Sequence, residues 1–134
     1  VYPVHNLTLI DRLTLSEINE FRLTLNINEL IPDDFLNAVA YSHSIYMANN
    51  QKATHDKFNK RVTDISTHFS EKGRVVIGEN VGYGYKTTEN LVKAWRDSKT
   101  HREVLKGHFT HIGISNVADS KGKIYTTTIF LLIK

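Results

Sequence analysis

The 134-residue sequence has no cysteine, which excludes a disulfide framework and any site that needs a thiolate. It has only two prolines, and its prolines, glycines and serines do not gather into a linker that would separate domains. The longest apolar run, Ile129 to Ile133, is far shorter than the ~20 residues that a membrane-spanning helix requires. These features predict one domain with one hydrophobic core, in which the apolar run is a buried strand.

Charge of one sign is not concentrated anywhere in the chain. Seventeen lysines and arginines against fourteen aspartates and glutamates give a net charge of +3 at pH 7, and no run of five or six like charges occurs. Proteins that bind nucleic acid usually gather their basic residues on one face. We therefore expect an ordinary mixed surface and no nucleic-acid partner.

The clearest helical pattern lies between Pro32 and Asn50, where apolar residues recur every three or four positions behind an acidic first turn. Residues 1–15 lack such a pattern and predict an irregular or partly extended N-terminal arm. Ser16 is the predicted N-cap of the first helix. Further helices are predicted over residues 59–69, 87–98 and 100–106.

The C-terminal part of the chain predicts paired strands. Residues 111–118 and 123–133 alternate on either side of a turn at Asp119 to Gly122, and residues 74–77 begin like a short strand that passes into glycine-punctuated backbone. Helices first and an antiparallel hairpin last indicate an α+β fold with helices covering the sheet. The predicted organisation is an arm, 1–15, followed by a single domain, 16–134.

Three of the seven histidines, His101, His108 and His111, lie close together in the sequence. They fall on three different local structures, since His101 is on a predicted helix, His108 lies beyond the break at Gly107, and His111 opens a strand. The HExxH pattern of helical zinc sites is absent. Alone, these histidines do not predict a metal site.

Glu79 lies in an apolar segment flanked by glycines. A carboxylate in such surroundings is poorly solvated unless a cation or a hydrogen-bond donor meets it. Two interpretations stay open from the residues alone: a turn carboxylate that caps backbone amides, or a member of a functional site. His43, on the apolar face of its helix, is predicted to be a core histidine, and Trp95 a core residue.

Several motifs together resemble bacterial CAP-superfamily domains, the SCP-like relatives of cysteine-rich secretory proteins, antigen 5 and plant pathogenesis-related proteins. The resemblance extends from about Ser16 to Phe130, and its most specific parts are Gly-Glu-Asn and the Trp-x-x-Ser-x-x-His-Arg helix. The motifs are, in order, INEFR, ATHDKFNKRV, GENVGYGY, NLVKAWRDSKTHREVL, FTHIGISNV and YTTTIF. The resemblance implies a three-layer α-β-α sandwich with a central antiparallel sheet flanked by helices.

The resemblance also implies a cleft lined by two histidines and an acidic residue. His55 and His101 match the two histidines, and Glu79 matches the glutamate of Gly-Glu-Asn. The family's second acidic position is Ser98 here, so a four-ligand metal site is not expected. The residues expected at the rim of the cleft are Asn80, Ser98 and Arg102.

Two imidazoles and one carboxylate are suitable ligands for Zn²⁺ or another divalent cation, with a position left open for water. The candidate metal ligands are therefore His55, Glu79 and His101. The same three side chains can instead form a hydrogen-bonded network that holds no metal. No serine nucleophile with a nearby basic partner stands out in the sequence.

The resemblance favours a non-catalytic domain whose cleft binds a divalent cation or a small ligand, with a lipid or sterol among the candidates. A zinc-dependent hydrolase or peptidase is one alternative, and a surface module that binds a host or partner protein is another. The absence of cysteine and the start at Val1 fit a secreted or cell-surface bacterial protein. We expect a removed targeting segment, with membrane attachment only through an N-terminal lipid anchor, as in an outer-membrane lipoprotein.

Overall fold

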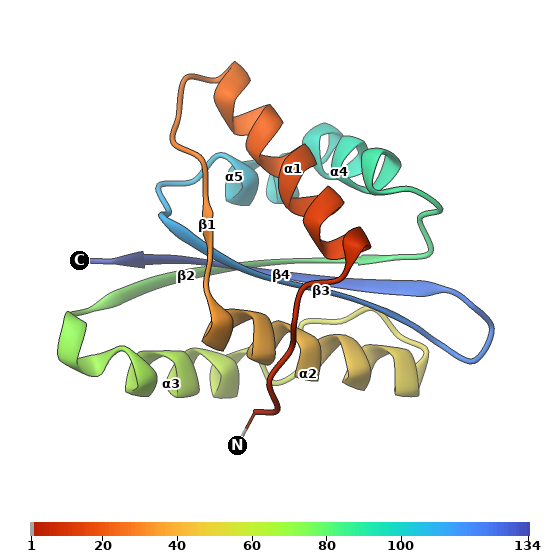
Figure 1. Cartoon of the computed structure of the whole chain (residues 1–134), viewed down its shortest axis with the longest axis horizontal. Coiled ribbons are helices and arrows are strands. Elements are labelled where there is room, and N and C mark those ends of the chain that lie inside the picture. Colours follow the sequence, from red (N-terminus) through yellow and green to blue (C-terminus); the bar gives the residue numbers. More distant parts are fainter. Residues whose placement is uncertain (1) are drawn as a thin grey trace.

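A four-stranded sheet lies between two layers of helices in the computed structural model, which describes residues 2–134 (Figure 1). Val1, the first residue of the predicted arm, lies outside the described residues. The elements are α1 (Leu9–Thr24), β1 (Ile31–Pro32), α2 (Asp34–Asn50), α3 (Phe58–His68), the short 3₁₀ helix η1 (Ser70–Lys72), β2 (Val75–Tyr83), α4 (Thr88–Asp97), α5 (Lys99–Leu105), β3 (His111–Ala118) and β4 (Ile124–Ile133).

The three-layer sandwich predicted from the sequence is confirmed. Helices α1, α4 and α5 lie on one face of the sheet, and α2 and α3 lie on the other (Figure 1). The strand order is β1-β3-β4-β2, and β4 is antiparallel to both of its neighbours. The predicted hairpin is β3–β4, and the one departure from an antiparallel sheet within residues 2–134 is the two-residue β1, which pairs with β3 in parallel.

The prediction of an irregular arm up to residue 15 is wrong for its second half, because α1 begins at Leu9. Thr8, not Ser16, is the N-cap: its side chain accepts from the Asp11 backbone N–H at 3.1 Å, and the Asp11 carboxylate accepts from the Thr8 N–H at 2.9 Å. This reciprocal capping box stabilises the start of a helix. Asp11 is fully buried and also accepts from Asn116 of β3, which fixes the helix to the sheet.

Strand β2 also differs from the prediction, since it continues through the glycine-rich segment as far as Tyr83. Two glycines leave room for packing. A Cβ at Gly82 would lie 2.4 Å from Leu91, and one at Gly78 would lie 3.0 Å from the Phe109 ring. Gly84, with φ +77°, follows the end of the strand. Gly78 and Gly82 therefore allow side chains of the covering layer to pack closely against a regular strand.

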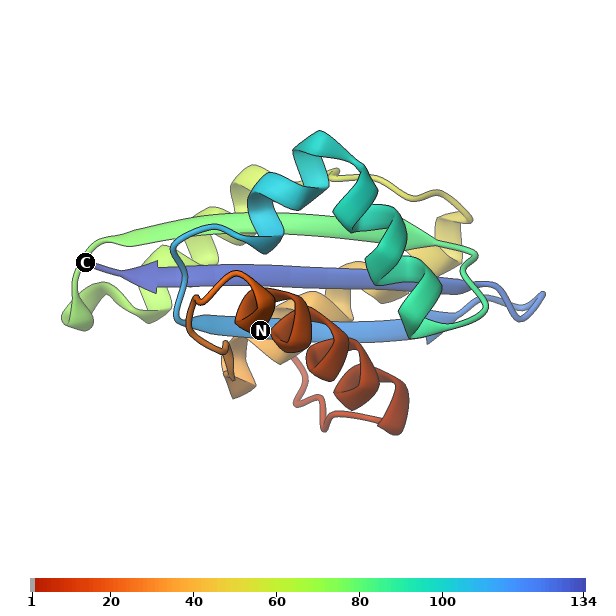
Figure 2. The same ribbon diagram turned by 90° about the horizontal axis from the view of Figure 1, so that it is seen from above.

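The alternation of β2 directs neighbouring residues to opposite layers. Glu79 points toward α2 and α3, whereas the amide of Asn80 bonds to α5 on the other face. Because β2 is an edge strand, a site at its margin can receive side chains from both layers. Figure 2 shows α4 crossing the sheet diagonally, with α5 over β2 and α1 over the opposite side of the sheet.

The hydrophobic core is divided by the sheet. One cluster, which includes Ile18, Trp95, Ile112 and Phe130, packs between the sheet and α1, α4 and α5. A second, which includes Leu36, Val39, Ile65 and Ile129, packs between the sheet and α2 and α3. Among residues 2–134, no helix is both long enough and apolar enough to traverse a bilayer.

Gly113 is a position where α2 approaches the sheet very closely. A Cβ built there would lie 2.2 Å from the backbone carbonyl of Leu36, and a backbone group cannot move aside as a flexible side chain can. We expect Gly113→Ala to lower the free energy of unfolding by about 2–3 kcal/mol through overpacking, measured by urea denaturation. Ser120→Ala, in the exposed hairpin turn, is the control and should change it by less than about 0.5 kcal/mol. Equal stability of the two variants would contradict this close approach.

Candidate functional site

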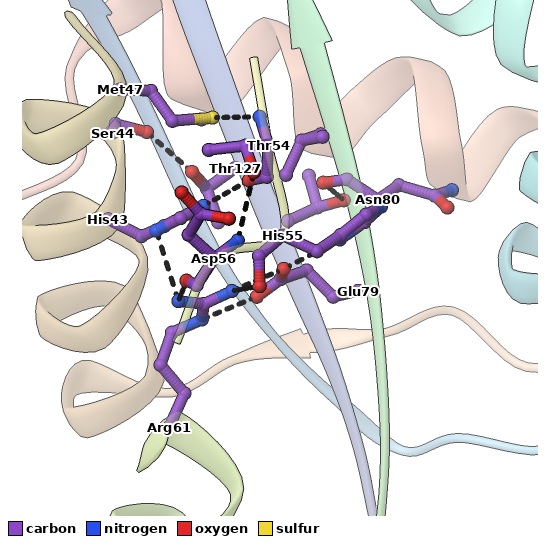
Figure 3. Close-up of polar contacts among 12 residues, drawn as sticks. His43, Ser44, Met47, Thr54, His55, Asp56, Arg61, Glu79, Asn80 and Thr127 are labelled. Carbon is purple, nitrogen blue, oxygen red and sulfur yellow. Dashed lines mark hydrogen bonds and ion pairs between the residues drawn. The ribbon is translucent and has the colours of Figure 1, made fainter. Parts of the chain in front are cut away.

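The centre of the candidate site is Glu79, whose side chain is 2% exposed. Arg61 of α3 binds this carboxylate with two nitrogens: Nε donates to Oε2 at 2.7 Å and Nη2 donates to Oε1 at 2.6 Å (Figure 3). Such bidentate, charge-assisted pairs are among the strongest polar contacts in proteins. The cation that a carboxylate in this apolar segment requires is therefore supplied from within the chain.

His55 lies in the segment between α2 and α3 and reaches Glu79 from the side. Its Nδ1 is 2.9 Å from Glu79 Oε1, and its side chain remains 55% exposed (Figure 3). The buried carboxylate thus fixes the orientation of an imidazole that is itself accessible to solvent. Nε2 of His55 has no hydrogen-bond partner in the described part of the chain.

Arg61 also holds the segment that carries His55. Its Nη1 donates to the Asp56 carbonyl at 2.6 Å, and its Nη2 donates to the His55 carbonyl at 3.3 Å. The Arg61 side chain is 6% exposed, so these contacts are made away from water. One side chain therefore neutralises Glu79 and positions the backbone at His55 and Asp56.

The neighbouring His43, on α2, exists as one defined tautomer. A guanidinium can only donate, so His43 Nδ1 must accept from Arg61 Nη1 at 3.0 Å, which leaves Nε2–H to donate to the Thr54 carbonyl at 2.6 Å. Burial, followed by the charge of Arg61, lowers the pKa of His43. The sequence prediction that His43 is a core histidine is confirmed, since the residue is 4% exposed.

His101 approaches the same edge of the sheet from the opposite layer. Its Nδ1 is 2.9 Å from Ser98 Oγ, and its ring stacks on Trp95 with 6.2 Å between centroids. Asn80 of β2 donates to the His101 carbonyl at 3.1 Å, which ties α5 to the strand. Burial and, secondly, the charge of His55 lower the pKa of His101, so the two imidazoles lie within electrostatic reach of each other.

A groove of about 300 Å³ opens beside His101. Trp95, predicted as a core residue, is 2% exposed and lies beneath it, while Tyr83 and Tyr85 stand about half exposed at its margin. Within the described chain, the groove has no lysine, arginine or carboxylate in its wall. Its lining residues are Ala53, Val81, Gly82, Tyr83, Tyr85, Ala94, Trp95, Ser98 and His101.

Not every residue expected at the rim reaches the site. The guanidinium of Arg102, on α5, donates to the carbonyl of Arg96 in α4 at 2.8 Å. His108 is exposed, and the His111 ring bonds to the Thr110 hydroxyl. Of the three histidines that crowd together in the sequence, His101 is the one beside the groove.

The structure does not offer Glu79 as a free metal ligand. Its carboxylate is bound by Arg61 and His55, and residues 2–134 contain no group of three or more histidine, cysteine, aspartate or glutamate side chains placed to hold a metal ion. A closed three-ligand site of His55, Glu79 and His101 therefore does not fit this structure. His55 and His101 each have Nδ1 engaged in a hydrogen bond, and neither Nε2 has a partner in the described part of the chain.

Arg61 is the functional residue that the sequence interpretation missed. Its signal was present in the requirement that a cation or donor meet Glu79, but the chain has seventeen lysines and arginines and nothing local selects one of them. The choice depends on α3 packing against β2 in three dimensions. His43 likewise joins the network only through Arg61.

We expect Arg61→Met to lower the free energy of unfolding by about 3–5 kcal/mol, because it leaves a buried carboxylate without its counter-ion. Urea denaturation followed by circular dichroism measures the loss. Arg102→Met is the matched control, since that side chain makes one backbone contact near the surface. Replacing Glu79 as well, in Arg61→Met/Glu79→Gln, should recover part of the loss. A change below about 1 kcal/mol for Arg61→Met would refute this role.

Acid should destabilise the fold through His43. Because its pKa is lowered in the folded state, the unfolded chain binds more protons between the unfolded pKa of about 6.5 and the folded value. The free energy of unfolding should therefore fall as the pH is lowered through about 6.5, and this contribution should be fully present above it. His43→Gln should show a shallower dependence in urea titrations from about pH 7.5 to about 5. Identical slopes for the two proteins would rule out a buried neutral His43.

Comparison with known proteins identifies relatives across almost the whole chain. The model of the CAP family, described as the cysteine-rich secretory protein family, matches residues 15–130. An uncharacterized protein of Borreliella burgdorferi is 31% identical over 94 residues, which are 70% of this chain and 59% of that protein. The uncharacterized protein YkwD of Bacillus subtilis is 48% identical over 50 residues, 37% of this chain and 19% of that protein.

Solved structures show the same fold. An outer surface protein from Borrelia burgdorferi superposes with a TM-score of 0.83 and 24% sequence identity, and the match covers 100% of both chains. The two curated relatives are longer than the matched region, since the match spans about three fifths of one and about a fifth of the other.

Proposed function

Because the chain belongs to the CAP, or cysteine-rich secretory protein, family, we propose that it is an extracytoplasmic, non-catalytic binding domain. In this proposal, the cleft at His55 and His101 takes a divalent cation or a small ligand. The extracytoplasmic assignment is supported by the name of the outer surface protein that shares the fold. Secretion or attachment through a lipid anchor is part of the proposal. The observation that carries the binding role is His55, an exposed imidazole held in a fixed orientation by a buried ion pair.

A cation would be held by Nε2 of His55 and of His101. Histidines that ligate metals usually donate their other ring N–H to a carboxylate or other acceptor, which fixes the tautomer. Glu79 is placed to do this for His55, and the Ser98 hydroxyl contacts the corresponding nitrogen of His101. Glu79 is thus a positioning residue, and Zn²⁺, which accepts imidazole ligands readily, is the probe of choice.

Two contacts favour binding over hydrolysis. Glu79, the carboxylate that a hydrolase would use as a general base, is engaged on both oxygens by Arg61. Ser98 contacts His101, but no carboxylate within residues 2–134 bonds to that imidazole to orient it as a base. The groove has a polar end at His101 and an aromatic margin. Together with the two contacts above, these features favour a site that binds a ligand over a site that catalyses hydrolysis.

The test is zinc titration calorimetry at about pH 7.5, where imidazoles are neutral. We expect saturable heat from the wild type and at least a roughly tenfold weaker Kd, or none, for His55→Ala and for His101→Ala, because each variant removes one of two ligands. His108→Ala, in an exposed turn, is the control and should bind as the wild type does. Binding should weaken as the pH falls below about 6, when imidazoles are protonated.

Unchanged heat in both site variants would contradict the two-imidazole site, and so would a wild type that gives no heat at all. A cleavage assay on a peptide library with added zinc then separates binding from catalysis. The proposal predicts no cleavage above the buffer background.

A further inference from the structure

A second cavity, of about 260 Å³, lies on the α2 and α3 side of the molecule, near the start of the described chain. It shares no lining residue with the groove beside His101. Arg61 closes its inner end, so the cavity lies against the ion-pair network just described. Its lining residues are Tyr2, Val39, Ser42, His43, Tyr46, Lys57, Lys60 and Arg61.

The wall of this cavity contains three cationic side chains and, among the described residues, no carboxylate. Arg61 is neutralised by Glu79, and Lys60 pairs with Asp64 at 2.7 Å. Within residues 2–134, Lys57 forms no ion pair, and its ammonium lies 5.1 Å from the centroid of the Tyr46 ring. One positive charge at the cavity is therefore left without a counter-ion.

Two acidic residues close to the cavity are held by tyrosines at its edge. Tyr46 donates to Asp56 at 3.1 Å, and Tyr2 donates to Asp64. Burial, with the hydrogen bond to Asp64, raises the pKa of Tyr2 to about 12, so its phenol stays neutral. The tyrosines add polar groups and aromatic faces to the wall and contribute no negative charge.

Lys57 has a strained backbone. Its φ is +64° and its ψ is +22°, in the left-handed region that glycine and asparagine adopt readily and that a lysine adopts at a cost. Its side chain does not cap α3. Residues held in such a conformation concentrate at ligand sites. A lysine here places an ammonium at the cavity where structure alone would favour glycine.

From these contacts we infer that the cavity binds the phosphate group of a glycerol phosphate ester, which is a monoester when free and a diester when it is a lipid head group. Two ammonium groups and the Ser42 hydroxyl offer several donors, which matches an oxyanion with many acceptor positions. The rings of Tyr2 and Tyr46 would contact the carbon part of the ligand. The volume admits a ligand the size of a glycerol phosphate, either free or as the head group of an anionic lipid.

The experiment is a titration of ¹⁵N-labelled protein with glycerol 3-phosphate at low salt, followed by amide chemical shifts. We expect saturable shifts at Tyr46, Lys57 and Lys60. Lys57→Asn removes the ammonium but tolerates the left-handed backbone, and it should weaken binding about tenfold, the effect of losing one hydrogen bond from a charged group. Lys123→Gln, an exposed lysine in the hairpin, is the control and should bind normally.

Stability distinguishes a binding role from a structural one. Lys57→Gly relieves the backbone strain, so its thermal midpoint should equal or exceed that of the wild type while phosphate binding weakens as it does in Lys57→Asn. Cosedimentation with phosphatidylglycerol vesicles, against phosphatidylcholine vesicles, separates the two sources of the phosphate. Lys57-dependent binding to the vesicles assigns a lipid head group, and binding to the free ester alone assigns a soluble ligand.

The inference is overturned if neither glycerol 3-phosphate nor phosphatidylglycerol gives Lys57-dependent binding, or if Lys57→Asn binds as the wild type does. These outcomes are independent of the zinc titration, because neither His55 nor His101 lines this cavity.

Discussion

The ion pair between Glu79 and Arg61 is the interaction on which the site depends. A carboxylate with 2% of its side chain exposed would be costly to leave without a counter-ion, and the bidentate guanidinium supplies one at 2.6 and 2.7 Å. The same guanidinium holds the carbonyls of His55 and Asp56 and the ring of His43. The pair thus turns an irregular segment between two helices into a fixed support for an exposed imidazole.

The sheet edge explains how distant residues meet. Neighbouring residues on β2 point toward opposite layers. Glu79 contacts Arg61 of α3 and His55 on one side of the sheet, and Asn80 bonds to the backbone of α5 on the other. The margin of an edge strand is the part of the sheet where the two helical layers can approach each other. His55 and His101 approach this edge from different sides of the sheet for this reason, and the charge of His55 contributes to lowering the pKa of His101.

Much of the fold could be predicted because its signals are local. The acidic start and apolar period of α2 and the alternation around the β3–β4 turn depend on neighbouring residues alone. The beginning of α1 was missed because Thr8 and Asp11 form a capping box with aspartate in the last position, among leucines that stay exposed. Strand β2 was cut short because glycine normally weakens a strand, and only the packed side chains of Leu91 and Phe109 show why it is kept. The site, too, was predictable only in part. The family motifs identified His55, Glu79 and His101, whereas the role of Arg61 depends on tertiary packing and could not be predicted from the sequence.

The position of β4 has a consequence for biosynthesis. It follows every cleft residue in chain order, yet it lies inside the sheet and pairs with both β3 and β2, placing Ile129 beside Glu79. Until β4 emerges from the ribosome, the sheet that brings the carboxylate, the guanidinium and the histidine segment together is incomplete. A chain shortened ahead of Ile124 would therefore lose the cleft together with the sheet, even though every cleft residue would already have been synthesised.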